Sequence, residues 1–142
     1  MTQPILATAP VTGAPPTLPR VLCVGGEPRV LDGLALHLRR RYDLLTATSG
    51  AEALTVLEEN PGVAVVVSDM RMPGMNGAAF LARVRETYPE IVRILLTGHS
   101  EMESAVAAVN EGQIFRFLTK PCPAPALLAA VSSAVELHRL MT

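Results

Sequence analysis

The chain has 142 residues, 49% of them hydrophobic, which is enough to bury one sizeable core and does not call for a second domain. Twelve basic and thirteen acidic residues leave a formal net charge of -1 with no basic stripe, so we expect no direct contact with nucleic acid. No apolar stretch reaches the roughly 20 residues that cross a bilayer, and the first residues do not form a secretory signal. These features predict a cytoplasmic protein without a membrane partner.

Residues 1–19 differ in composition from the rest of the chain. They hold five of its twelve prolines, mixed with alanine, threonine and glycine, and this mixture favours extended, unpacked backbone. We therefore expect a disordered Pro/Ala/Thr-rich tail at 1–19 and one folded domain at 20–142.

The domain is expected to begin with a buried strand at 21–24, which the pair Gly25-Gly26 ends. A helix follows from Pro28, because proline suits the first turn of a helix, and it finishes in the arginine run at 39–41.

A second strand is predicted at 42–48. Ser49 is placed to cap the next helix, which Asn-Pro-Gly at 60–62 breaks.

The central feature of the sequence is an apolar run at 63–67, made of four valines and one alanine. Such a run is typical of a strand covered on both faces, as in parallel sheets, and it places Asp69 at the carboxyl end of that strand. The segment 72–77 turns the chain, and Asn76 is placed to cap a helix that begins near Ala78.

The remaining elements are predicted in the order strand 91–96, helix 102–109, strand 114–118 and a last helix from Ala124 onward. Thr97 follows the first of these strands, and Lys120 follows the second. Strand and helix alternate five times along the chain, which indicates an α/β fold with a doubly wound parallel sheet and right-handed crossovers.

Asp69, Thr97 and Lys120 all follow predicted strands, and the carboxyl ends of parallel strands form one crevice. Lys120 is the only lysine beside eleven arginines, and Asp69 is one of three aspartates. A carboxylate, a hydroxyl and an ammonium brought together suit phosphoryl transfer, with Asp69 as nucleophile and the other two holding phosphoryl oxygens. Taken singly, each also fits a structural role, as a turn residue, a helix cap or a solvated helix end.

Three motifs carry a resemblance to a known family. They are Ser-Asp-Met-Arg-Met-Pro-Gly-Met-Asn-Gly at 68–77, Leu-Leu-Thr-Gly at 95–98 and Phe-Leu-Thr-Lys-Pro at 117–121. With them, the stretch from Arg20 to Leu140 resembles the receiver domain of two-component response regulators. The resemblance implies a flavodoxin-like, doubly wound five-stranded parallel sheet of order 2-1-3-4-5, with helices on both faces.

The resemblance also implies roles for individual residues. Asp69 is similar to the phospho-accepting aspartate, Thr97 to the switch hydroxyl, Lys120 to the phosphoryl-binding lysine and Phe117 to the switch aromatic, and the bond between Lys120 and Pro121 is expected to be cis. The implied partner is a histidine kinase or phosphotransfer protein. The protein would be a phosphoprotein of signal transduction rather than an enzyme, with at most autophosphorylation from a phosphodonor. The stretch 108–117 resembles receivers joined to HD-phosphodiesterase-type output domains.

The sequence departs from this family where receivers carry two adjacent acids that help to hold Mg²⁺. Gly25 and Gly26 stand at those positions, so the remaining ligands would be Asp69, the Arg71 carbonyl and Glu27. Losing two carboxylates should weaken Mg²⁺ binding, and phosphorylation with it. The two glycines also fit an anion-binding nest, and the sequence does not separate natural loss of the acids from deliberate replacement.

We therefore predict a receiver that acts mainly as a phosphorylation-independent or phosphorylation-impaired interaction module. The face formed by helix 102–109, strand 114–118 and the last helix would contact an effector domain, another partner protein or a second copy. The apolar end of the last helix, Leu137, Leu140 and Met141, is either a frayed end or a continuation into such a partner.

Two other functions stay open from the sequence. The chain could be a working phosphoacceptor that takes phosphate from a histidine kinase on Asp69. It could also be a flavodoxin-like binder of a small ligand at the strand ends.

Overall fold

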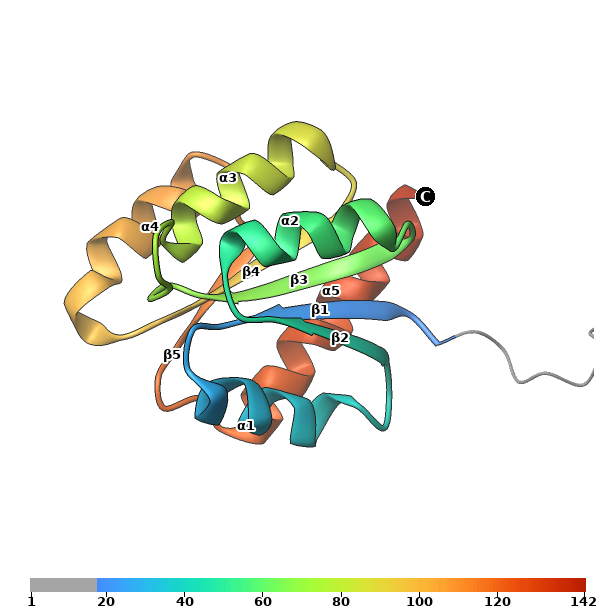
Figure 1. The fold of residues 1–142 in the computed structure, drawn as a ribbon, viewed down its shortest axis with the longest axis horizontal. Coiled ribbons are helices and arrows are strands. Elements are labelled where there is room, and N and C mark those ends of the chain that lie inside the picture. Colours follow the sequence, from blue (N-terminus) through green and yellow to red (C-terminus); the bar gives the residue numbers. More distant parts are fainter. Residues whose placement is uncertain (1–17) are drawn as a thin grey trace, which may run out of the picture.

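The computed structural model describes residues 18–142, so the predicted tail lies outside the described residues except for Leu18 and Pro19. Five parallel strands form one sheet in the order β2-β1-β3-β4-β5, which confirms the predicted fold class and strand order (Figure 1). The strands are β1 Arg20–Val24, β2 Asp43–Ala47, β3 Val63–Asp69, β4 Val92–Thr97 and β5 Arg116–Thr119. The helices are α1 Pro28–Leu38, α2 Gly50–Glu59, α3 Gly77–Thr87, α4 Met102–Asn110 and α5 Ala124–Met141, with a short 3-10 helix η1 His99–Glu101 before α4.

Helices cover both faces of the sheet. In Figure 1, α1 and α5 lie on one side of the strands, and α2, α3 and α4 lie on the other. Two hydrophobic clusters match these layers: one joins the strands to Leu34 of α1 and Val131 of α5, and the other joins them to Leu57 of α2 and Phe80 of α3. No helix within residues 18–142 is long and apolar enough to cross a bilayer.

The central strand is β3, whose seven residues are all buried. Its valines pack into the helices on both faces, which is why the sequence shows a continuous apolar run rather than an alternating one. Both predicted helix caps are present, since the Ser49 side chain accepts from the Glu52 amide at 3.1 Å and the Asn76 side chain accepts from the Ala79 amide at 2.8 Å.

The limits of four strands differ from the sequence prediction. β1 begins at Arg20 rather than at 21, and β4 ends at Thr97 rather than at 96. β2 is shorter than 42–48 by one residue at each end. β4 begins after Ile91, because the Ile91 amide donates to the Tyr88 carbonyl in the turn that follows α3. β5 is Arg116–Thr119 rather than 114–118, because the chain reverses at Gly112, where φ is +74°, and comes into register with β4 only at Arg116.

The two ends of the described chain lie at the edge of the sheet where the strands begin. Leu18 and Thr142 line the same surface pocket, together with Arg20 at the start of β1 and Gly62 just before β3. The opposite edge, where the strands end, holds Asp69.

Gly77, the first residue of α3, packs directly on the end of β3. Its amide donates to the Met70 carbonyl at 2.8 Å, and a Cβ atom at this position would overlap the Asp69 carbonyl oxygen and lie 2.9 Å from Met70 Cα. The close approach of α3 to Asp69 therefore requires glycine, because any side chain would push the backbones apart.

We expect Gly77→Ala to destabilise the fold by about 3 kcal/mol, since overpacking against fixed backbone forces α3 away from β3. Gly33, an exposed residue of α1 with open space around it, is the matched control. Gly33→Ala should stabilise by up to about 1 kcal/mol through helix propensity alone. Denaturant unfolding of both variants measures the two free energies, and equal effects would contradict the contact at Gly77.

Candidate functional site

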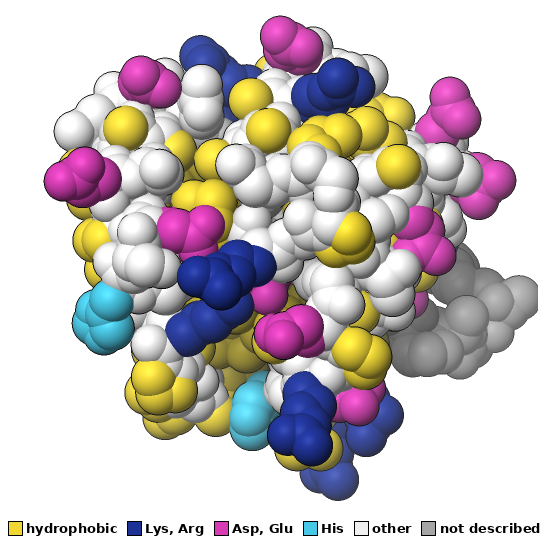
Figure 2. Space-filling model, turned by 60° about the vertical axis from the view of Figure 1, so that its left-hand side comes forward, with side chains coloured by type: hydrophobic (Ala, Val, Ile, Leu, Met, Phe, Trp, Pro, Cys, Tyr) yellow, Lys and Arg dark blue, Asp and Glu magenta, His cyan; other side chains and the backbone are white. Residues whose placement is uncertain are grey.

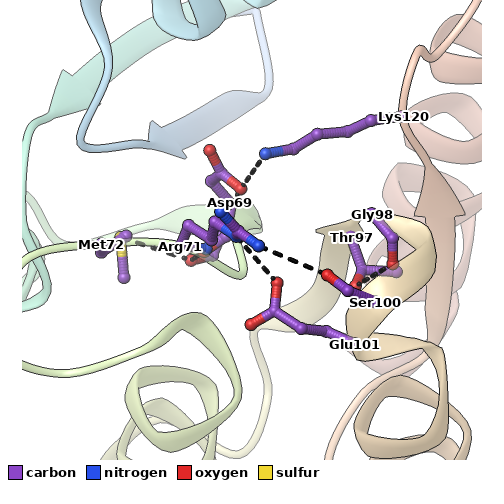
Figure 3. Close-up of polar contacts among 9 residues, drawn as sticks. Asp69, Arg71, Met72, Thr97, Gly98, Ser100, Glu101 and Lys120 are labelled. Atoms are coloured by element: carbon purple, nitrogen blue, oxygen red, sulfur yellow. Dashed lines mark hydrogen bonds and ion pairs between the residues drawn. The ribbon is translucent and has the colours of Figure 1, made fainter.

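The candidate site lies at the carboxyl edge of the sheet. Asp69 ends β3, Thr97 ends β4, and Lys120 directly follows β5. In the close-up of Figure 3, Asp69 and Lys120 point toward each other, while Thr97 lies beside Gly98. The Thr97 hydroxyl donates to the Gly98 carbonyl at 3.2 Å. The strand ends thus bring the acid and the amine into contact, with the hydroxyl on the neighbouring strand turned to its own backbone.

Asp69 is the best-buried charged group of the site. Its side chain is 0% exposed, and Oδ1 lies 2.6 Å from Lys120 Nζ, whose side chain is 28% exposed. Oδ1 also accepts the Arg71 amide at 3.2 Å. A carboxylate this deeply buried needs such partners, because an ionised group out of water is otherwise very costly.

The second carboxylate oxygen has no such partner. Asp69 Oδ2 is buried and forms no hydrogen bond within the described chain. An unmatched buried acceptor costs roughly 1 to 3 kcal/mol, so Oδ2 is the position in this pocket at which a donor, a cation or a covalent bond would be gained.

The two glycines that replace the expected acids do face this pocket. A Cβ at Gly25 would lie 3.7 Å from Asp69 Cβ, and a Cβ at Gly26 would lie 3.7 Å from the Arg71 carbonyl oxygen. Glu27 follows them as the residue before α1, with an exposed side chain that does not cap the helix.

The pocket offers fewer ligands for Mg²⁺ than the resemblance implies. Mg²⁺ requires a near-octahedral set of oxygen ligands and usually one or two carboxylates. Here the pocket offers one carboxylate, Asp69, whose Oδ1 is already paired with Lys120, and the Arg71 carbonyl. Within residues 18–142, no three His, Cys, Asp or Glu side chains gather where they could hold a metal.

A polar bridge that the sequence did not predict joins the loop after β3 to η1, beside the pocket. Arg71 Nε donates to Glu101 Oε1 at 3.2 Å, and Arg71 Nη2 donates to Ser100 Oγ at 3.3 Å (Figure 3). Figure 2 shows basic and acidic side chains close together near the middle of the face that it presents. Arg71 and Glu101 are 30 positions apart in the sequence, so no local sequence pattern predicts the pair. Because this ion pair lies at the surface, it contributes at most about 1 kcal/mol to the free energy of unfolding.

The backbone of the third motif, at 117–121, has the conformation that the resemblance implied. The bond between Lys120 and Pro121 is cis. Phe117 lies in β5 opposite Leu95, and its partly buried ring packs on the side of the sheet that α2, α3 and α4 cover.

Comparison with known proteins shows the family. Residues 21–132 match the response regulator receiver domain. The chain belongs to that family. A receiver domain protein from Clostridium thermocellum has a similar structure, with a TM-score of 0.83 and 31% identity over 88% of this chain and 100% of that chain.

The receiver occurs in proteins of more than one kind. The hydrogenase transcriptional regulatory protein HoxA of Cupriavidus necator is 41% identical over 120 residues, which is 84% of this chain and 25% of HoxA. The signal receiver domain of an HD domain-containing protein from Pseudomonas fluorescens Pf-5 gives a TM-score of 0.80 and 35% identity, covering 86% of this chain and 98% of that one. The chain thus spans about a quarter of the length of the curated relatives that it matches.

Stability measurements on the receiver will test the pair of Asp69 and Lys120. Lys120→Met keeps the aliphatic stem but leaves the buried carboxylate unpaired, so we expect a loss of about 3 kcal/mol. The same change in an Asp69→Ala background should cost less than about 1 kcal/mol, because no buried charge is left behind. A loss of equal size in both backgrounds, measured by denaturant unfolding, would show that the two groups do not interact.

Proposed function

We propose that this receiver domain acts mainly as an interaction module that works without phosphorylation or is only weakly phosphorylated. The observation that carries the proposal is the pocket beside Asp69, where Gly25 and Gly26 leave one carboxylate and that carboxylate is already neutralised by Lys120. Phosphoryl transfer depends on positive charge that bridges and neutralises the moving group. A pocket that holds its cation poorly would transfer phosphate slowly.

In this proposal, the pocket stays in one state. The ion pair between Asp69 and Lys120 takes up the charge that a metal and a phosphoryl group would otherwise balance. With no change of charge at Asp69, nothing biases the domain between two packings, so its partner surface is presented constitutively.

The proposed partner surface is the face formed by α4, β5 and α5. On α4 it exposes the apolar side chain of Val106, which is 41% exposed. Leu140 and Met141, 69% and 54% exposed, extend the apolar surface at the far end of α5. The partner would be an effector domain, another protein or a second copy of this chain. HoxA, about four times as long as the aligned segment, supports an effector domain of the transcriptional type. The similar receiver from an HD domain-containing protein supports one of the HD type.

In the second candidate function, Asp69 is a working phosphoacceptor that receives phosphate from a histidine kinase or phosphotransfer protein. The free Asp69 Oδ2 favours it. Oδ2 would attack the phosphorus of the donor, the new bond would be an acyl phosphate, and the donor's leaving group would depart with the electron pair. Lys120 would neutralise charge on the phosphoryl oxygens. Nothing in the pocket favours the third function, a small-ligand binder.

Acyl-phosphate formation with acetyl phosphate and Mg²⁺ separates the two candidates. We expect the unaltered chain to be labelled at least about tenfold more slowly than Gly25→Asp and the double variant Gly25→Asp/Gly26→Asp, because the added acids supply metal ligands. Intact-protein mass spectrometry measures the label, and Asp69→Asn is the unlabelled control. Rapid labelling of the unaltered chain would overturn the leading proposal, and labelling of no variant would remove the phosphoacceptor.

A further inference from the structure

A small cavity opens between α1 and α5, which lie on the same side of the sheet (Figure 1). Its volume is about 250 Å³. Leu34 of α1, Leu96 of β4 and Leu127 of α5 line it, and all three belong to the hydrophobic cluster beneath these helices. The cavity thus reaches the apolar core, where an apolar group of a ligand would be favoured because it displaces water.

The polar side chains of the lining are basic or neutral. They are Arg29 and His37 of α1 and, after β5, Lys120 and Cys122. Among the described residues, no Asp or Glu lines the cavity. Ligand sites combine apolar walls with a few polar groups that fix the orientation of the ligand. Two permanent cations and no acid in the lining favour a ligand that carries negative charge.

The two cations differ in how far their charge is already balanced. Lys120 Nζ lies 2.6 Å from Asp69 Oδ1, and in Figure 3 the lysine side chain points toward that carboxylate. Arg29 is exposed and forms no ion pair within residues 18–142. A guanidinium binds one carboxylate through two parallel hydrogen bonds. Arg29 therefore matches a ligand with one carboxylate, whereas a second negative charge on the ligand would compete with Asp69 for Lys120.

Gly33 keeps the cavity open on the side of α1. It belongs to the lining, and a Cβ atom there would have no heavy atom within 4 Å. Because the surrounding space is open, a long side chain at position 33 would occupy part of the cavity without overlapping the protein. Glycine inside a helix costs up to about 1 kcal/mol relative to alanine, so the open space comes with a less stable α1.

We propose that this cavity binds a small organic monocarboxylate with a compact apolar body. The apolar body would lie on Leu34, Leu96 and Leu127, and Arg29 would bind the carboxylate. Lys120 lines the cavity while its ammonium stays on Asp69, so the ligand site borders the Asp69 pocket and leaves its ion pair in place. The proposal goes beyond the interaction module and does not depend on whether Asp69 is phosphorylated.

Cys122 gives the test a direct readout. It lines the cavity and is partly exposed, whereas the other cysteine, Cys23, is 0% exposed. Iodoacetamide should therefore alkylate Cys122 in the folded chain, in mildly alkaline buffer because burial raises the pKa of the Cys122 thiol. The probe is phenylacetate. At about 10 mM it should slow alkylation at least about fivefold, measured by intact-protein mass spectrometry, because ligands of this size bind in the millimolar range.

Two matched probes separate the contribution of charge from that of apolar burial. Phenylacetamide keeps the ring and lacks the charge, and acetate keeps the charge and lacks the ring. Each should slow the alkylation of Cys122 less than about twofold, because each loses one of the two interactions.

Two variants test the lining. Arg29→Gln removes the guanidinium, and Gly33→Leu fills the cavity, so each should cut the protection by phenylacetate to less than about twofold. Arg83→Gln is the matched control, because Arg83 is an exposed arginine of α3, on the opposite side of the sheet, and this variant should keep full protection. Each alkylation rate is compared with that of the same variant without phenylacetate.

The site would be overturned by any of three results: no protection by phenylacetate, equal protection by phenylacetamide, or undiminished protection in Arg29→Gln or in Gly33→Leu. Protection that grows with protein concentration in the absence of phenylacetate would assign the cavity to an interface with a second copy, and would overturn it too. None of these results bears on the labelling of Asp69 by acetyl phosphate, so the ligand site and the proposed function fail separately.

Discussion

The site depends on one contact, the ion pair between a fully buried Asp69 and Lys120 at 2.6 Å. A carboxylate without water is tolerated only where a cation and hydrogen-bond donors replace the solvent, and here Lys120 and the Arg71 amide do so for one oxygen. The pair also reaches across β4, which lies between β3, where Asp69 ends the strand, and β5, which Lys120 follows. The relative positions of β3 and β5 at this edge are therefore set by charge as well as by apolar packing.

The ion pair between Asp69 and Lys120 also explains why the absence of acids at positions 25 and 26 changes the charge balance of the pocket. In a pocket with three carboxylates, a lysine is shared among competing negative groups, and a divalent cation relieves their repulsion. With Gly25 and Gly26 in place, Lys120 meets one carboxylate, and the two charges match without a metal. The protein thus balances the charge of its pocket internally, which is the physical argument for the phosphorylation-independent function proposed above.

The sequence predicted those parts of the structure that follow from local patterns. The valine run located β3, the alternation of elements gave the sheet, and strand ends brought Asp69 and Lys120 together. The sequence did not predict the contacts made by loops, because these contacts join segments that are far apart in the chain. The bridge from Arg71 to Glu101 has no signature in spacing or composition. The start of β5 was predicted at 114 from the apolar residues there, but after the turn at Gly112 the strand begins only at Arg116.

The placement of the two chain ends has an architectural consequence. Leu18 and Thr142 line one pocket at the edge of the sheet opposite Asp69, and both ends leave the fold on the same side in Figure 1. A polypeptide joined at Leu18 or at Thr142 would begin at the edge of the sheet opposite Asp69. A neighbouring domain would therefore be connected at the edge where the strands begin, and not at the edge that carries the pocket.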